Sequence, residues 1–584
     1  MNKITIFLAL TLICGSAFAQ KLGDVSKQLR IFNQLYKTLD EYYVDTLNPE
    51  KNISTAVNSM LEDLDPYTEY YTPSSAKDFN TMITGKYAGV GAIIHYYKAA
   101  DRCVIYQLYE GNPAQKAGLK VGDILLSIDG KDLGKRGKQD INSYTSSVSQ
   151  KLRGDPNTTI TVTVKRPGVD SVISLQVHRA AVQMPCVPYF GMIDGETGYI
   201  YLNSFTADCS QDVLSAFQNL KKRGMKKLVF DLRSNGGGSA NEAVKIVNMF
   251  VPRGKLILTM KGKTPSSNTS YATQSEPQDL QMPLVVLVNG SSASASEITC
   301  GSLQDLDRAV ILGERTFGKG LVQQTRELPG GAMLKLTTSH YYIPSGRCIQ
   351  ALDYSHRTSS GEAYRTPDSL TSLFHTEAGR PVRDGGGIVP DVVVKSDTMP
   401  TALAYLVNSD EYFDWLNSYC LRHPSISQPE DFALSDADYQ DLIDSLAHSS
   451  FAPEYRSLGV IKQLRSLLKA EEADSLSRCL LDSLERSLKP DISRILIQHK
   501  TLMKERISTD ICDRYYYNTG AIRNMLTHDP QLKAALSLLG ASERYSAILN
   551  PKMKGAESKV KSAEVKVAGA ESAKVSTEAK VNGL

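Results

Sequence analysis

The stretch 282–307 places several serine hydroxyls where a nucleophile could be activated. Residues 282–288 form a short apolar run that ends at Asn289-Gly290, which predicts a buried strand followed by a turn. The run SSASASE at 291–297 then leads into a helical pattern over 297–307. A serine here lies at a helix N-terminus, where unpaired backbone N–H groups and the helix dipole face any oxyanion formed beside it.

Lys319 is the obvious base for such a serine, because a serine hydroxyl is a weak nucleophile on its own. A helix of about eleven residues runs about 16 Å away, and a strand over 308–312 returns by about the same distance. The lysine acts as a base only when neutral, so its pKa must fall from about 10.4 toward neutrality. Phe317 and the flanking glycines predict a tight, partly apolar niche for it.

These residues resemble the signature of the carboxyl-terminal processing peptidases, a serine-lysine family. The resemblance rests on SASASEI, on the 25 residues from Ser294 to Lys319 within TFGKG, and on Gln323 four residues further on. It implies that Ser294 is the nucleophile, Lys319 the general base and Gln323 the residue that orients the lysine. The competing serines of the motif are Ser291, Ser292 and Ser296. Taken alone, the serine run is also typical of a helix N-cap.

A glycine loop at 231–238 (DLRSNGGG) follows a predicted strand and precedes a predicted helix. Glycine lets backbone N–H groups approach a tetrahedral intermediate closely. In the resembled family this loop supplies one oxyanion donor and the residue after the nucleophile the other, which correspond to Gly237 and Ala295. The family often has proline where this chain has Gly236, so which glycine N–H points inward is left open. A plain glycine turn is the alternative.

Strands and helices alternate around this loop. Strand patterns begin at Thr197 and at Lys227, and helical patterns cover 209–223 and 240–250. Together with the later strands, this alternation predicts an α/β core with a partly parallel sheet. The resemblance implies that the core, 183–400, has a crotonase-like (ClpP/crotonase) fold.

Residues 84–182 are expected to form a β-rich domain inserted before the core. The runs GKYAGVGAII at 85–94 and GNPAQKAGLKVGDILLSIDG at 111–130 are similar to a PDZ domain of the bacterial protease type. Such a domain accepts a peptide as an added strand and captures its terminal carboxylate with backbone N–H groups. The candidates are Gly89, Val90, Gly91 and Ala92. A nucleotide-binding loop is disfavoured, because the G-x-G-x-x-G spacing is absent and no helix follows.

The N-terminal residues have the features of a secretory signal peptide. Residues 1–19 combine a basic start, an apolar centre and the small-residue site Ala17-Phe18-Ala19. The apolar run is too short for a good membrane span, so no integral span is expected after its removal. We therefore expect an exported protein of a bacterial periplasm or cell envelope.

Sequence patterns predict the structure of the remaining segments. We expect a helical N-terminal region at 22–83, a polar surface loop at 351–370, a helical C-terminal region at 401–550 and a low-complexity, disordered tail at 551–584. The motifs do not reach the C-terminal region, and packing against the core or dimerisation is its default role.

Charge and cysteine usage exclude several classes of protein. The formal net charge of +3 argues against nucleic acid as a partner. The eight cysteines beyond Cys14 show no CxxC pair and dictate no disulfide framework. Cys300 falls inside a helical run, which favours a buried structural thiol over a cysteine nucleophile. A Ser-His-Asp triad through His340 is disfavoured because no G-x-S-x-G elbow is present.

The resemblance thus implies a serine endopeptidase that takes unfolded or tagged envelope proteins by their C-terminal ends. Its partners would be protein or peptide substrates with accessible C-termini, and a homo-oligomer is possible. No cofactor is expected, and no His, Cys or carboxylate cluster suggests a metal. Two alternatives stay open: a non-catalytic PDZ scaffold that binds peptides, and a crotonase-like acyl-CoA enzyme, against which the signal peptide and PDZ domain argue.

Overall fold

The structure is a computed structural model that divides into two compact units. It describes residues 3–358, 361–449, 451–453, 455–471 and 475–550. The smaller unit contains residues 3–76 and 323–337, and the larger unit contains the other described residues. The tail predicted at 551–584 lies outside the described residues.

The smaller unit is built from N-terminal helices and short strands. Its elements are α1 (Lys3–Tyr42), α2 (Pro49–Glu62), β1 (Glu69–Tyr71), the start of α3 (Pro73–Thr84), and parts of β17 (Leu321–Glu327) and β18 (Met333–Tyr342). Helix α2 begins where Asn48 Oδ1 accepts a hydrogen bond from the Lys51 amide at 3.0 Å. Within the described part of the chain, no helix is both long and apolar enough to cross a membrane.

Residues 86–183 form the expected β-rich domain. Strand β2 (Lys86–Gly89) pairs antiparallel with β9 (Ala180–Gln183), so the chain enters and leaves the domain side by side. The sheet has the order β3 (Ala92–Tyr97), β4 (Arg102–Leu108), β5 (Ile124–Ile128), β7 (Thr159–Lys165) and β8 (Val172–His178), with β6 (Lys131–Asp132) beside β5. The helices of the domain are α4 (Pro113–Lys116) and α5 (Ile141–Leu152).

The core contains a six-stranded sheet that is parallel except at one edge. Its order is β10 (Tyr189–Met192), β11 (Thr197–Tyr201), β12 (Lys227–Asp231), β15 (Leu284–Val288), β16 (Val310–Gly313) and β23 (Val392–Val393). Only the β10–β11 pair of these six strands is antiparallel. This sheet confirms the α/β core with a partly parallel sheet.

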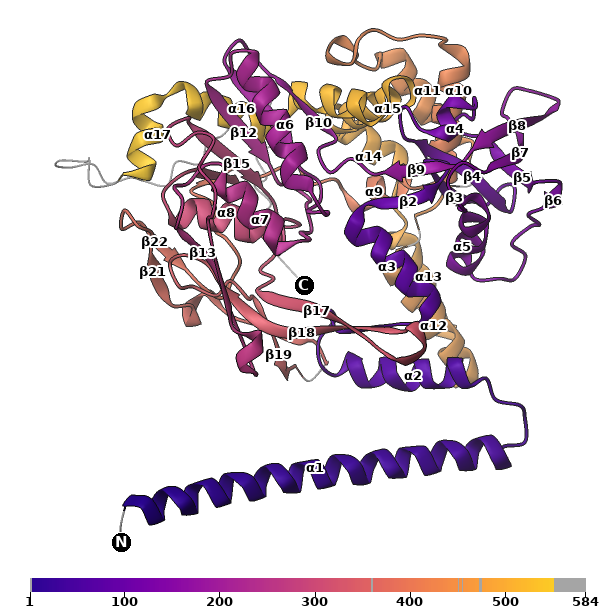
Figure 1. Ribbon diagram of the computed structural model, residues 1–584. Coiled ribbons are helices and arrows are strands. Elements are labelled where there is room, and N and C mark those ends of the chain that lie inside the picture. The colour runs from indigo at the N-terminus through magenta and orange to yellow at the C-terminus, as the bar shows by residue number, and fades with distance from the viewer. Residues whose placement is uncertain (1–2, 359–360, 450, 454, 472–474, 551–584) are drawn as a thin grey trace, which may run out of the picture. The chain divides into compact units, whose positions relative to one another are not determined.

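Helices cover both faces of this sheet (Figure 1). Side chains alternate across a strand, so Leu228 and Phe230 of β12 enter one hydrophobic cluster while Val229 enters the other. The first cluster contains α6 (Cys209–Lys222), α7 (Ala240–Asn248) and α8 (Ala295–Asp305). The second contains α16 (Pro530–Gly540) and α17 (Ser542–Leu549). The C-terminal helices therefore complete the core.

The remaining elements extend the core. Strands β13 (Leu256–Gly262) and β14 (Thr269–Ala272) pair with each other, and β13 also pairs with the second half of β18. The prediction of a surface loop at 351–370 is wrong in part, because β19 (Leu352–Arg357) and β20 (Ala363–Arg365) form an antiparallel hairpin there. Strands β21 (Leu373–His375) and β22 (Pro381–Arg383) form a second hairpin.

The C-terminal region is helical, as predicted. Between the core strands and α16 lie α9 (Thr401–Val407), α10 (Asp410–Arg422), α11 (Asp436–Ala447), α12 (Arg456–Ala470), α13 (Ser475–Leu488), α14 (Ile492–Gln498) and α15 (Lys500–His528). Apolar side chains of α9, α10, α11, α14 and α15 share one hydrophobic cluster, with Leu403, Leu442 and Ile507 fully buried in it.

An ion pair network ties the end of β12 to α16. The Arg233 guanidinium lies 2.5 Å from Asp231 and 2.6 Å from Asp529, and it donates to Gln531 Oε1 at 3.0 Å. Both carboxylates are buried. Since a buried charge is costly without its partner, the arginine holds the C-terminal helices on the sheet.

We therefore expect Arg233→Met to destabilise the protein by about 3 to 5 kcal/mol, because two buried carboxylates lose their counter-charge. The matched control is Arg223→Met, since Arg223 is exposed at the end of α6. The measurement is the thermal unfolding midpoint of both variants by circular dichroism. Equal midpoints for the two variants would contradict this role of Arg233.

Candidate active site

Ser294 occupies the predicted position at the N-terminus of α8, but with an unusual backbone conformation. It is the N-cap residue, with φ of 57° and ψ of −113°. A non-glycine residue rarely adopts a positive φ, and such conformations cluster at functional sites. The turn lies between the carboxyl end of β15 and α8, so the serine is presented at the carboxyl edge of the parallel sheet.

The competing serines of the motif have other contacts. The hydroxyl of Ser292 donates to Leu232 O at 2.8 Å, and that of Ser296 donates to Asn235 O at 2.8 Å. Both side chains are fully buried, whereas Ser291 is exposed and Ser294 is half-buried. The hydroxyls of Ser292 and Ser296 therefore serve the structure of the turn.

Glu297 joins the serine turn to the lysine loop. Its Oε2 accepts hydrogen bonds from the amides of Ser294 and Lys319, each at 2.9 Å. Its Oε1 accepts from the Gly318 amide at 2.7 Å and from Thr316 Oγ1 at 2.5 Å. Because one oxygen receives both amides, the backbones of Ser294 and Lys319 are immediate neighbours.

The electrostatics of Glu297 follow from this burial. The side chain is completely buried, and loss of solvation raises its pKa above 4.5, while the four donors act in the opposite direction. A carboxylate offers about four acceptor positions, and the donors fill them. The role of Glu297 was missed from the sequence, although the spacing Ser-x-x-Glu before a helix is the signal of a capping box.

Asn235 connects the glycine loop to the same turn. Its carbonyl accepts from the Ala293 amide at 3.0 Å and from Ser296 Oγ. Its side chain donates to Leu202 O at 2.8 Å and accepts from the Gly237 amide at 2.9 Å. This buried asparagine therefore fixes the loop after β12 against the loop after β15.

Gly237 lies directly against the serine turn. A Cβ added at Gly237 would lie 2.8 Å from Ser294 Cβ and 2.9 Å from the Ala295 amide nitrogen. Only glycine leaves room there, and its φ of 100° also favours glycine. The structure thus brings Gly237, Ser294 and Ala295 together. The Gly237 amide itself is engaged with Asn235 Oδ1, a contact that the sequence did not indicate.

The lysine loop at 314–320 follows β16. Lys319 is half-buried, and the preceding Phe317 amide donates to Ser292 O at 3.0 Å. Gly318 is held closely, because an added Cβ would lie 2.5 Å from Ala351 Cβ. The Phe317 side chain is 40% exposed, and the partly apolar niche around the lysine stays a prediction.

Gln323 lies on β17 in the smaller unit. Its Nε2 donates to Thr337 Oγ1 on β18 at 3.1 Å. Its predicted role toward Lys319 stays a prediction.

His340, the base of the disfavoured triad, is exposed on β18. Cys300 is fully buried in α8, and burial raises the pKa of its thiol, which suits a structural residue.

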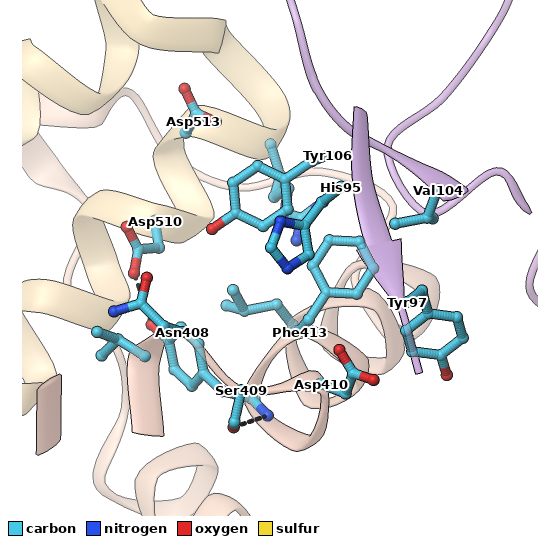
Figure 2. Close-up of a pocket in the computed structure, with 14 residues that line it drawn as sticks. His95, Tyr97, Val104, Tyr106, Asn408, Ser409, Asp410, Phe413, Asp510 and Asp513 are labelled. Carbon is cyan, nitrogen blue, oxygen red and sulfur yellow. Dashed lines mark hydrogen bonds between the residues drawn. The ribbon is translucent and has the colours of Figure 1, made fainter. Parts of the chain in front are cut away.

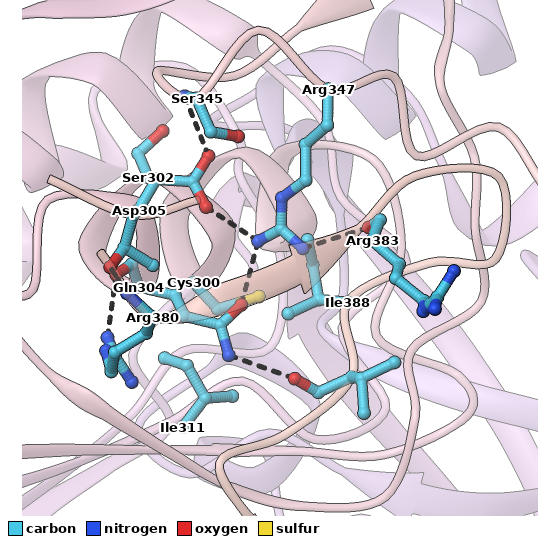
Figure 3. Close-up of polar contacts among 12 residues, drawn as sticks. Cys300, Ser302, Gln304, Asp305, Ile311, Ser345, Arg347, Arg380, Arg383 and Ile388 are labelled. Atoms are coloured by element: carbon cyan, nitrogen blue, oxygen red, sulfur yellow. Dashed lines mark hydrogen bonds and ion pairs between the residues drawn. The ribbon is translucent and has the colours of Figure 1, made fainter. Parts of the chain in front are cut away.

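The far end of α8 is clamped by two buried arginines (Figure 3). The guanidinium of Arg347 lies 2.7 Å from Asp305 and donates to Gln304 Oε1 at 2.8 Å. Arg380 pairs with Asp391 at 2.6 Å and donates to Gln304 O at 2.8 Å. The runs PSGR at 344–347 and GIVPD at 387–391 therefore hold the helix whose other end bears Ser294.

Backbone hydrogen bonds and close packing hold the candidate peptide-binding loop of the β-rich domain in place. Val90 is 3% exposed, and its carbonyl accepts from the Ala114 amide at 2.7 Å. Gly91 has φ of 76°, and an added Cβ would lie 2.4 Å from Asn112 Cβ. Gly89 ends β2 and Ala92 begins β3. The loop is thus preformed at the start of strand β3.

A separate cavity of about 180 Å³ lies between this domain and the C-terminal helices (Figure 2). The rings of Tyr106 and Phe413 stack with centroids 5.6 Å apart beside it. Tyr97 Oη donates to Asp414 at 2.9 Å. Neither Ser294 nor Lys319 lines this cavity, so it belongs to the contact between the two domains.

Three family models match the chain. A model of peptidase family S41 matches residues 196–354, and a PDZ-domain model matches residues 104–166. A model of the C-terminal helical domain of probable PDZ-proteases matches residues 402–539. The matches follow the order of the β-rich domain, the α/β core and the helical region along the chain.

The chain is also similar to individual proteins. A probable CtpA-like serine protease of Staphylococcus aureus is 34% identical over 356 residues, which covers 60% of this chain and 69% of that protein. A carboxy-terminal-processing protease of Bartonella bacilliformis is 33% identical over 353 residues, with coverages of 59% and 79%. The solved photosystem II D1 C-terminal processing protease is 27% identical, with coverages of 64% and 89% and a TM-score of 0.34.

We expect Glu297→Gln to loosen both loops, because an amide group replaces one acceptor oxygen with a donor that faces other donors. The expected loss of stability is about 1 to 3 kcal/mol. Hydrogen exchange of the backbone amides of Gly318 and Lys319 should become faster. The matched control is Glu276→Gln, since Glu276 is exposed. Unchanged exchange at both amides in the Glu297 variant would refute its connecting role.

Proposed function

The chain belongs to the carboxyl-terminal processing peptidases of family S41, which are proteases, and on that premise we propose a serine endopeptidase that uses Ser294 and Lys319. The observation that supports this pair most directly is the shared oxygen of Glu297. Two amides at 2.9 Å from one buried carboxylate oxygen bring the backbones of both residues together. A nucleophile and its base require such proximity.

In the proposed mechanism, Ser294 Oγ attacks the carbonyl carbon of the peptide bond. Lys319, when neutral, accepts the hydroxyl proton as general base. The ammonium then gives the proton to the leaving amine as the tetrahedral intermediate collapses to an acyl-enzyme. A water molecule, activated by the same lysine, hydrolyses this ester and releases the second product. Gln323 would orient the lysine, an assignment that rests on the family resemblance.

The oxyanion would be stabilised by two backbone amides beside Ser294. Ala295 is the first residue of α8, so its amide is one of the donors that the helix does not use internally. Gly237 is proposed as the second donor. Because its amide is engaged with Asn235 Oδ1, this role requires the amide to turn from that oxygen toward the substrate. Gly237 and the next residue, Gly238, both have positive φ and supply the backbone freedom for such a change.

Substrates would be proteins or peptides with accessible C-termini. The PDZ domain would add the terminal segment as a strand along β3 and bind its carboxylate with the amides of Gly89, Val90, Gly91 and Ala92. The domain would span 84–182 and the peptidase core, of crotonase-like fold, 183–400. The predicted signal peptide at 1–19 supports unfolded or tagged proteins of the bacterial envelope as substrates.

The first test is cleavage of an unfolded protein with an apolar C-terminus by the chain lacking residues 1–19. We expect Ser294→Ala and Lys319→Ala each to reduce the rate by about 10³-fold or more, because each removes a group used in the chemical step. Ser291→Ala and Lys263→Ala are the controls, since both side chains are exposed.

Two other outcomes would contradict the proposed pair. If folded Ser294→Ala still cuts, the nucleophile is another residue. If the unsubstituted chain binds the peptide without cutting it, the chain is a peptide-binding scaffold.

A second test concerns the glycine loop. Gly237→Ala should reduce cleavage by about 10²-fold or more, because the new Cβ would lie 2.7 Å from Ala293 O and 2.8 Å from Ser294 Cβ. Gly236→Ala is the matched control within the same loop, since a Cβ there has no atom within 4 Å. Equal rates for the two variants would show that the loop does not line the reacting groups.

A further inference from the structure

Two buried cysteines, Cys186 and Cys209, belong to the same hydrophobic cluster of the core. Cys186 lies between β9 and β10 and is 2% exposed, and Cys209 is the first residue of α6 and fully buried. Cys186 Sγ donates to Asp212 Oδ2 at 3.0 Å. Asp212 and Cys209 are three residues apart in the first turn of α6, so they share one face of the helix. The neighbouring Cys186 side chain is the largest cause that raises the pKa of the Cys209 thiol, and burial raises it further.

From this geometry we propose that Cys186 and Cys209 are a redox site that forms a disulfide in contact with a disulfide oxidant. One thiolate attacks a sulfur of the oxidant and forms a mixed disulfide, and the second thiolate displaces the remaining oxidant thiolate. The protein pair loses two electrons and two protons, and the oxidant disulfide is reduced to two thiols. Asp212 Oδ2 is placed to accept the Cys186 proton as the thiolate forms.

A cavity that could admit a small oxidant lies beside the first turn of α6. This cavity of about 640 Å³ is lined by Asp208 and Ser210, the residues on either side of Cys209. Its other lining residues include Gln211 and Leu214 of α6 and Lys245 of α7. Both thiols are buried, and the cavity is lined by the two sequence neighbours of Cys209 and not by the thiols themselves.

The crosslink would fix the segment behind the glycine loop. The Cys186 carbonyl accepts from the Asn203 amide at 2.9 Å. The Phe205 amide donates to Gly237 O at 3.0 Å, and the Ser239 amide donates to Phe205 O at 2.8 Å. A disulfide from Cys186 to α6 would thus enclose the backbone that holds Gly237. This inference does not depend on the proposed peptidase chemistry.

The test is disulfide mapping of the full chain in a glutathione redox buffer, with free thiols blocked before digestion. Trypsin leaves both cysteines in one peptide, 180–221, because no lysine or arginine lies between its ends. Cleavage after Glu196 then separates Cys186 from Cys209. We expect two fragments that stay joined until reduction, together with a higher thermal midpoint for the oxidised chain than for the reduced chain.

The controls separate this pair from general oxidation. Cys186→Ser and Cys209→Ser should each abolish both the joined fragments and the difference in midpoint, whereas Cys103→Ser, in the PDZ domain, should keep both. A second arm refolds the chain from denaturant in the same buffer, so that burial does not limit access. Fragments that are separate and fully blocked in both arms would overturn the proposal, as would a link from either cysteine to a different partner.

Discussion

The buried carboxylate of Glu297 is the constraint on which the arrangement of the site depends. A desolvated carboxylate is very costly unless its oxygens are fully satisfied. Here the donors come from the serine turn and from the loop after β16, which are separated by more than twenty positions in the sequence. Neither segment can move away without exposing this charge to an apolar interior. The side chains of Ser294 and Lys319 therefore extend from neighbouring backbone positions that Glu297 holds together without any substrate.

The sheet supplies the frame for this carboxylate. Strands β12, β15 and β16 are parallel neighbours, so the loops that follow them emerge at one edge. Asn235 links the first loop to the second with backbone and side-chain hydrogen bonds, as Glu297 links the second to the third. Arg347 and Arg380 bind the C-terminal end of α8, opposite the end that bears Ser294. The site is thus braced by buried polar groups on a rigid apolar core.

Features governed by local pattern were predictable, and features governed by distant contacts were not. The apolar run before Asn289 and the small residues after it placed a serine at a helix start, because both signals are local, and the family resemblance singled out Ser294. The lengths of the following helix and strand predicted the return of Lys319. The four donors to Glu297, the engagement of the Gly237 amide and the hairpin within 351–370 depend on segments that meet only in the folded chain. The packing of α16 and α17 on the sheet belongs to the same class, since periodicity predicts helices but not the surface that they cover.

The backbone of Ser294 has an evolutionary consequence. At φ of 57° and ψ of −113°, glycine is the residue with the smallest steric penalty, and a serine there carries strain of about 1 to 3 kcal/mol. Selection for a stable fold alone would favour glycine there. A descendant freed from the need for a hydroxyl would gain stability through a change at this one codon. The strained backbone of Ser294 therefore supports the proposed role of its hydroxyl, because a residue without that role would be under no constraint to remain serine.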